Sequence, residues 1–131
     1  SSFVVKKFNY ILKKNFLKKK LKILIMGLAY KENSSDVRNS PVFEIYNQLK
    51  NKTNIKMLHV YDPLVKNKEI KYKIKKIDKL KTKYDGVILA VPHNKIIRDY
   101  HKLNKKFTHE HTKILDIKYM LKMKDNRICP L

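Results

Sequence analysis

The sequence predicts an α/β fold in which a doubly wound, mainly parallel sheet carries helices on both faces. Short apolar segments alternate along the chain with amphipathic segments at helical spacing, the pattern of strands joined by helical crossovers. The segments 23–29 and 87–91 are apolar throughout, which is typical of strands that are covered on both faces of a parallel sheet. The chain has 131 residues, enough for one domain with one sizeable core.

The first part of the chain predicts a helix, a strand and a second helix. Residues 3–17 place apolar side chains at helical spacing with lysines between them, so an amphipathic helix is expected. The run 23–29 is too short for a buried helix and is the first expected strand, and the polar segment 31–39 is a loop. Ser40 and Pro41 then predict a helix start, with serine as the N-cap and proline at the first position.

The remainder of the chain continues the alternation. The lysine-rich stretch 66–83 has few apolar residues and is expected to be exposed and irregular, with a short helix. Residues 94–103 have the pattern of a helix. The further strands are expected at 57–61, 87–91 and 113–117.

The composition narrows the class of protein. Lys+Arg is 32 against 11 Asp+Glu, a formal net charge of +21, which attracts polyanions without selecting among them. Only three of these cations are arginine, the residue that reads base edges best, and the lysines are spread along the whole chain. A basic α/β module that binds nucleic acid remains an alternative, as does a degenerate remnant that binds nothing. We do not expect sequence-specific nucleic-acid binding.

Several other classes are excluded or disfavoured by absences in the sequence. No apolar run approaches the ~20 residues of a membrane helix. A single cysteine cannot form an internal disulfide or supply tandem zinc modules. Nothing at the start has the pattern of a signal peptide, so we expect a cytoplasmic location.

The glycines argue against direct dinucleotide binding. A Rossmann phosphate turn needs several glycines so that the backbone can approach the pyrophosphate, and this chain has two in total, Gly27 and Gly86. The sequence therefore predicts a Rossmann-like sheet that lacks the glycine-rich phosphate loop. Side chains would have to supply any contacts to a nucleotide.

Candidate side chains lie where such sheets bind ligands, beyond the carboxyl ends of the strands. We expect residues 30–38, 61–64 and 92–95 to line that edge together. The first of these segments offers an aromatic ring at Tyr30 and two cations, Lys31 and Arg38. The alternative for this loop is a solvated segment in which Asp36 or Glu32 pairs with Arg38 on the surface.

Four motifs give the chain a resemblance to a known family. Residues 27–40 read GLAYKENSSDVRNS, residues 60–63 VYDP, residues 84–93 YDGVILAVPH and residues 115–118 LDIK. In this order and spacing they resemble the C-terminal, UDP-sugar-binding domain of the UDP-glucose/GDP-mannose dehydrogenase family. The Lys-Glu-Asn form of the first motif is more similar to the branch that oxidises UDP-N-acetylhexosamines.

The resemblance implies a nucleotide-sugar 6-dehydrogenase, in which NAD is bound by an N-terminal domain and an upstream cysteine attacks the C6 aldehyde. Two hydride transfers then give the uronic acid, a precursor of surface polysaccharides. Residues 1–20 would be the end of a linker helix from a central domain that forms a homodimer, and residues 21–131 the UDP-sugar-binding domain. Within this chain the resemblance implies no catalytic residue, so we expect the isolated chain to be inactive.

The resemblance also carries roles to individual residues. Tyr30 and Lys31 match positions that hold the UDP-sugar substrate, and Lys118 matches a basic substrate contact after the fourth strand. Arg38 matches a position that reaches the NAD cofactor.

The other residues with reactive or metal-binding side chains are expected to have structural or surface roles. Cys129 has no partner base near it in sequence, so a buried or frayed thiol is expected rather than a nucleophile. His93 is expected to be a polar surface group in a loop. His109 and His111 lack further ligands, so a solvated loop is expected rather than a metal site. Asp62 resembles the ribose-binding acid of Rossmann domains, but with Pro63 after it a turn-forming role is expected.

Overall fold

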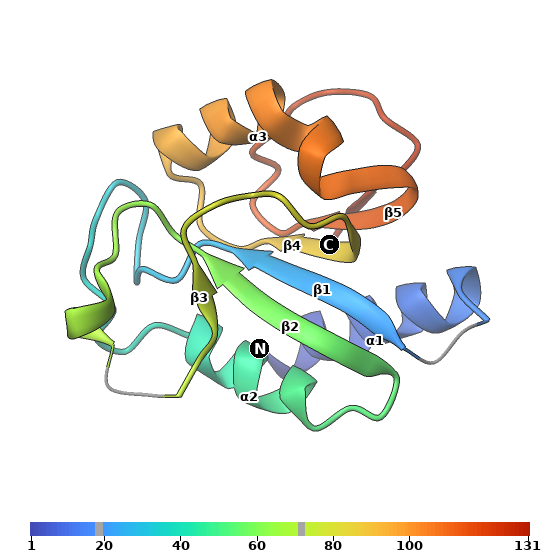
Figure 1. Cartoon of the computed structure of the whole chain (residues 1–131), viewed down its shortest axis with the longest axis horizontal. Helices are drawn as coiled ribbons and strands as arrows, with labels where there is room; N and C mark the ends of the chain where they lie inside the picture. The colour runs from blue at the N-terminus through green and yellow to red at the C-terminus, as the bar shows by residue number, and fades with distance from the viewer. Residues whose placement is uncertain (18–19, 71–72) are drawn as a thin grey trace.

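The fold is that of a computed structural model, which describes residues 1–17, 20–70 and 73–131. Its centre is a parallel six-stranded sheet in the order β3-β2-β1-β4-β5-β6, with helices on both faces (Figure 1). The strands are β1 (Leu21–Met26), β2 (Ile55–Tyr61), β3 (Lys76–Ile77), β4 (Tyr84–Leu89), β5 (Thr108–Asp116) and β6 (Ile128–Pro130). The helices are α1 (Ser2–Asn15), α2 (Val42–Lys50), α3 (Asn94–Phe107) and a short 3₁₀ turn, η1 (Asn67–Glu69). The expected fold class is confirmed.

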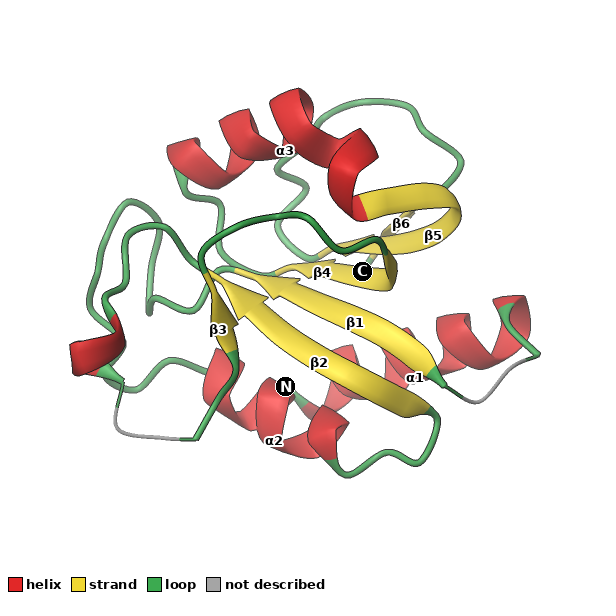
Figure 2. Cartoon of the chain, viewed as in Figure 1, coloured by secondary structure: helices red, strands yellow, loops and turns green. Residues whose placement is uncertain are grey.

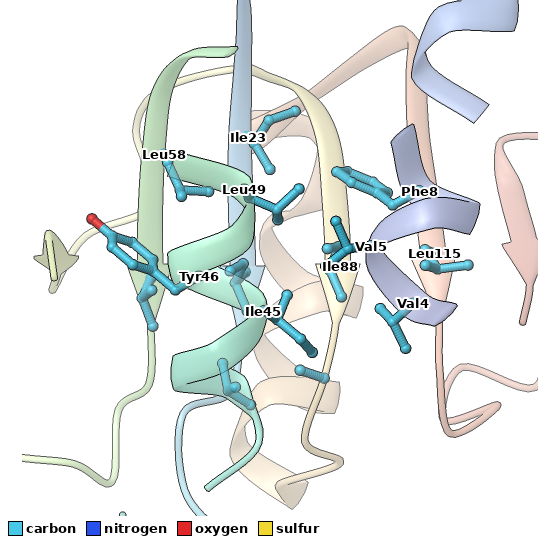
Figure 3. Packing of buried hydrophobic residues seen from close by; sticks show 14 of the residues in the cluster. Val4, Val5, Phe8, Ile23, Ile45, Tyr46, Leu49, Leu58, Ile88 and Leu115 are labelled. Atoms are coloured by element: carbon cyan, nitrogen blue, oxygen red, sulfur yellow. The ribbon is translucent and has the colours of Figure 1, made fainter. Parts of the chain in front are cut away.

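Both faces of the sheet are buried, which explains its apolar central strands. Along β1, Ile23 and Ile25 face one core cluster and Leu24 and Met26 the other, and all four are 0 % exposed. The first cluster lies under α1 and α2, whose side chains close over the strands (Figure 3). The second lies under α3, through Ile96 and other side chains of that helix.

Helix α1 is part of this core. Its residues Val4, Val5, Phe8, Ile11 and Leu12 are buried in the same cluster as α2 and the sheet. The helix approaches β4 so closely that a Cβ on Gly86 would stand 2.7 Å from Phe8 Cζ. A side chain at position 86 would therefore require Phe8 to shift.

The predicted start of α2 is confirmed by its hydrogen bonding. The helix is assigned from Val42, and Pro41 before it has helical dihedral angles, φ −68° and ψ −12°. Ser40 Oγ accepts a hydrogen bond from the Val42 N–H at 3.2 Å. The serine therefore satisfies one of the N–H groups that a helix start leaves without a partner.

Two short strands and one extension were not predicted. β3 and β6, at the two edges of the sheet, have two and three residues and no apolar alternation. β3 falls within the stretch 66–83, of which residues 71 and 72 lie outside the described ranges. β5 begins at Thr108, so the expectation of a solvated loop at His109 and His111 was wrong: both residues lie in a strand.

All the strands run in the same direction, so their carboxyl ends lie at one edge of the sheet (Figure 2). β1 pairs with β2 on one side and β4 on the other, so the loops that follow these three strands are neighbours. No helix in the described parts of the chain is long and apolar enough to span a bilayer.

Gly27 directly follows β1, which lies between strands β2 and β4. Its N–H donates to Tyr61 O at 2.8 Å, and its φ is +107°, a region that side-chain-bearing residues rarely adopt. A Cβ there would lie 2.6 Å from Val91 Cβ and 2.7 Å from Val91 N. Only glycine lets the chain turn this closely past the β4 loop.

We therefore expect Gly27→Ala to lower the free energy of unfolding by about 2–4 kcal/mol, since backbone strain and overpacking each cost about 1–3 kcal/mol. Urea unfolding of this chain measures the loss. Ser35→Ala, on the exposed part of the following loop, is the control and should change stability by no more than about 0.5 kcal/mol. Wild-type stability in Gly27→Ala would contradict the packing described for Val91.

Candidate functional site

Three loops meet at the carboxyl edge of the sheet, as the sequence predicts. The loop after β1 is bonded to the loop after β2 through Asp62 and to the loop after β4 through His93. Segments 30–38, 61–64 and 92–95 therefore lie next to one another at this edge.

Asp62 is the centre of this arrangement. Its Oδ2 accepts hydrogen bonds from the backbone N–H groups of Leu28 at 2.7 Å and Ala29 at 3.1 Å, and its Oδ1 accepts from the Leu64 N–H at 3.0 Å. The side chain is 0 % exposed. The bond to Leu64 confirms the turn-forming role predicted for Asp62, and the bonds to Leu28 and Ala29 add one that sequence reasoning missed.

His93 is buried, so its predicted place on the surface was wrong. Its side chain is 0 % exposed, with Nε2 2.9 Å from Asp62 Oδ2. The backbone N–H of Asn33 donates to His93 Nδ1 at 2.8 Å. A ring nitrogen that accepts a hydrogen bond carries no hydrogen, so the geometry assigns the ring hydrogen to Nε2, which donates it to Asp62.

These hydrogen bonds hold the acid in its charged form. Burial by itself raises the pKa of Asp62, but the hydrogen bonds from His93 and from the Leu28 N–H outweigh it. The pKa of this carboxyl therefore lies below its usual range.

Asn33 closes the connection between the two loops. Its backbone takes a positive φ of 58°, and its Oδ1 accepts a hydrogen bond from the Asn94 N–H at 2.9 Å. Together with the bond from Asn33 N–H to His93, this contact ties the middle of the first loop to the start of α3.

The predicted substrate residues Tyr30 and Lys31 lie between two fixed points of the loop, Ala29, which is bonded to Asp62, and Asn33, which is bonded to His93. Tyr30 is 57 % exposed, and Lys31 is exposed as well. The Tyr30 N–H donates to Asp36 O at 2.7 Å, which folds the loop back on itself. Both side chains are therefore available at the edge where an α/β sheet binds its ligand.

Arg38 forms the surface ion pair considered as the alternative for this loop. Its Nε and Nη2 donate to Asp36 Oδ1 and Oδ2 at 3.0 and 2.9 Å. The Arg38 side chain is nevertheless 86 % exposed. The side-chain and backbone hydrogen bonds from Arg38 lower the pKa of Asp36 to about 2, so the pair is ionised at neutral pH.

Lys118 stands on a separate turn at the same edge. It follows β5, which is separated from β1 by β4, so its backbone is roughly two strand spacings, or ~10 Å, from the end of β1. Buried Asp116 holds this turn by accepting hydrogen bonds from the N–H groups of Met120 at 2.9 Å and Leu121 at 3.0 Å. Sequence reasoning missed this role of Asp116, although an acid at the end of an apolar strand was a signal for it.

The other candidates stay outside the site. Cys129 is a partly buried thiol on the edge strand β6. His109 Nε2 lies 2.9 Å from Asp85 Oδ1, and His111 is largely exposed. Within the described ranges, no three metal-ligating side chains gather in one place.

Comparisons with known proteins agree in pointing to one family. Residues 24–123 match the family described as the UDP-glucose/GDP-mannose dehydrogenase family, UDP binding domain. The chain is 35 % identical over 108 residues to UDP-N-acetyl-D-glucosamine 6-dehydrogenase from Pseudomonas aeruginosa, covering 76 % of this chain and 24 % of that enzyme. The enzyme of the same name from Salmonella typhi is 29 % identical over 102 residues, with the same coverage.

Solved structures show the same fold. UDP-N-acetyl-mannosamine dehydrogenase Cap5O from S. aureus superposes with a TM-score of 0.73 at 24 % identity, over 98 % of this chain and 29 % of that one. UDP-D-ManNAc dehydrogenase from Pyrococcus horikoshii gives 0.72 at 23 % identity, over 97 % and 29 %. The chain thus spans about a quarter of the length of the curated relatives it matches.

Asp62→Asn tests the energetic weight of the buried carboxylate. The amide keeps the shape but loses the charge that three backbone N–H groups and His93 share, so we expect unfolding to become easier by about 2–4 kcal/mol. Urea unfolding at pH 7 measures this, with Glu110→Gln as the control because the Glu110 side chain is 86 % exposed. Equal effects of the two substitutions would contradict the role given to Asp62.

The same group predicts part of the acid sensitivity of the chain. Because the pKa of Asp62 is lowered in the folded state, its contribution is complete above the unfolded-state pKa of about 3.9 and is lost as pH falls through the folded value. Unfolding free energies measured from pH 7 down to pH 3 should fall less steeply below pH ~4 in Asp62→Asn than in wild type. Parallel curves would exclude Asp62 as a source of the slope.

Proposed function

This chain belongs to the UDP-glucose/GDP-mannose dehydrogenase family, in which it corresponds to the UDP-binding domain, and we propose that it holds the UDP end of a nucleotide-sugar substrate. The enzyme it serves is an NAD-dependent 6-dehydrogenase that oxidises a UDP-hexose or UDP-N-acetylhexosamine to the uronic acid. The similarity to UDP-N-acetyl-D-glucosamine 6-dehydrogenases supports the N-acetylhexosamine as the substrate class.

The observation that carries this proposal is the exposed cation Lys31, presented on a loop fixed from both sides. An ammonium group at the carboxyl edge of the sheet can donate charge-assisted hydrogen bonds to a diphosphate. The exposed ring of Tyr30 beside it can pack against a base or sugar and donate its hydroxyl. In this proposal, Lys31 binds the diphosphate and Tyr30 packs beside it.

Lys118 contributes a second positive charge from the other side of β4. A diphosphate carries charge on both phosphates, so cations from two separate loops can hold it at two points. The turn that carries Lys118 is fixed by buried Asp116, which supports a defined position for its backbone. We propose that Lys118 contacts the substrate from this side.

The loop after β1 does not fit the pyrophosphate of NAD. In a Rossmann domain the backbone N–H groups of this loop hold the pyrophosphate, but here the N–H groups of Leu28 and Ala29 are engaged by Asp62. We therefore propose that NAD binds to a domain outside this chain. Arg38, whose side chain is 86 % exposed, is the residue we propose to reach the cofactor from this side.

The reaction as a whole belongs to the longer enzyme. The chain spans about a quarter of its curated relatives, and we propose that the nucleophilic cysteine, the cofactor site and a dimer-forming central domain lie in the remainder. The chain alone is then inactive as a dehydrogenase. We further propose that the uronic acid is a precursor for surface polysaccharide synthesis. We propose a cytoplasmic location for the enzyme.

We expect UDP to bind this chain and Lys31→Ala to weaken that binding tenfold or more. A charge-assisted hydrogen bond contributes ~1.5–3 kcal/mol, and 1.4 kcal/mol corresponds to a factor of ten. Isothermal titration of UDP at fixed ionic strength measures the change.

The matched control for this titration is Lys50→Ala. Lys50 is an exposed lysine at the C-terminal end of α2, and its removal changes the net charge equally. Nonspecific attraction of anions would weaken in both variants alike, whereas a defined contact is lost only in Lys31→Ala. An unchanged affinity in Lys31→Ala would remove this residue from the site.

For Arg38→Ala, we expect the melting temperature of the chain to stay unchanged, because the Arg38–Asp36 pair is exposed and such pairs add little to stability. In the complete enzyme, the same substitution should raise KM for NAD more than KM for the UDP-sugar. Steady-state kinetics with each substrate varied in turn measures both constants. Unfolding of the domain would instead assign Arg38 a structural role.

A further inference from the structure

The loop that carries Lys31 is anchored at two points by buried side chains from other loops. Asp62 binds the backbone N–H of Ala29, two residues before Lys31. His93 binds the backbone N–H of Asn33, two residues after it. Lys31 is thus the middle residue of the segment 29–33, whose two ends are held by these hydrogen bonds. We call this segment the arch.

The first anchor occupies the place of a ligand. In a glycine-loop nucleotide fold, the N–H groups after the first strand bind a phosphate of the cofactor, and the loop takes its bound form around that anion. Here the carboxylate of Asp62 accepts those hydrogen bonds at 2.7 and 3.1 Å and is 0 % exposed. The anion that shapes this loop belongs to the chain itself.

The second anchor is bonded to the first. His93 Nε2 lies 2.9 Å from Asp62 Oδ2, and Nδ1 of the same ring accepts a hydrogen bond from the Asn33 N–H at 2.8 Å. Asn33 then accepts from the Asn94 N–H at 2.9 Å, at the start of α3. Both anchors bond to the backbone of the loop and not to the side chain of Lys31.

We propose that Asp62 and His93 are positioning residues that fix the arch around Lys31 before the nucleotide arrives. This inference rests on the proposed function, because it concerns the affinity of the same site. A flexible loop loses conformational freedom when a ligand orders it, and this loss weakens binding. A loop that is already ordered by an internal carboxylate and imidazole avoids that loss.

His93→Ala is the central variant, with His111→Ala as its control, because the side chain of His111 is 77 % exposed. Two quantities are measured on this chain: the affinity for UDP by titration, and the exchange rates of individual backbone amides by NMR without ligand. We expect the Asn33 amide to exchange at least tenfold faster in His93→Ala. We expect UDP to bind at least fivefold more weakly, while amides of β4 keep their protection.

Two conservative variants separate the anchor from a general loss of stability. In His93→Asn the side-chain oxygen can take the place of Nδ1 and accept from the Asn33 N–H. In His93→Gln the amide can reach the place of Nε2 and donate to Asp62. We expect His93→Asn to recover both the Asn33 protection and the UDP affinity, and His93→Gln to recover neither, and this pair decides the question if His93→Ala does not fold.

The outcomes distinguish this inference from the function on which it rests. Unchanged UDP affinity in folded His93→Ala, or weaker binding without faster exchange at Asn33, overturns the positioning role. Failure of the wild-type chain to bind UDP overturns the proposed function, and the exchange rates still show whether His93 fixes the arch.

Discussion

The hydrogen bonds from the Leu28 and Ala29 N–H groups to the carboxylate of Asp62 govern the ligand edge of this domain. Backbone N–H groups that are removed from water need an acceptor, and after the first strand of a parallel sheet two of them point at the same place. Filling that place with an internal acid has two effects. It fixes the loop without a ligand, and it closes the position that a pyrophosphate would otherwise take.

The packing of the rest of the domain holds the carboxyl end of β1 in position. β1 has a buried strand on each side and a core cluster on each face, so its carboxyl end is held from all directions. Gly27 lets the chain turn past Val91 with no room for a side chain, which brings the β1 and β4 loops within reach of each other. Asp116 has a similar role at the end of β5. Its buried carboxylate accepts hydrogen bonds from backbone N–H groups and so fixes the turn that carries Lys118.

Much of the fold could be predicted because burial on both faces leaves a continuous apolar run, as in β1 and β4. β3 and β6 could not, because two or three residues at a sheet edge carry no periodicity. The position of Lys31 at the ligand edge followed from strand order, but the burial of His93 did not. His93 is bonded to Asp62, which is 31 residues away in sequence, and the residues around His93 give no sign of that distant partner.

Among the acidic residues whose burial the structure describes, four lie inside the protein: Asp62, Asp85, Asp99 and Asp116. The charged groups that an approaching solute can touch are therefore mostly lysines, and the field around the chain follows its strongly positive net charge. Such a field speeds the arrival of every anion and weakens as salt is added. Speed of encounter and choice of ligand thus arise from different parts of the molecule. The many lysines spread over the chain gather anions from solution without discrimination, and the residues placed at the loop edge, Lys31 among them, are the ones that can select a ligand.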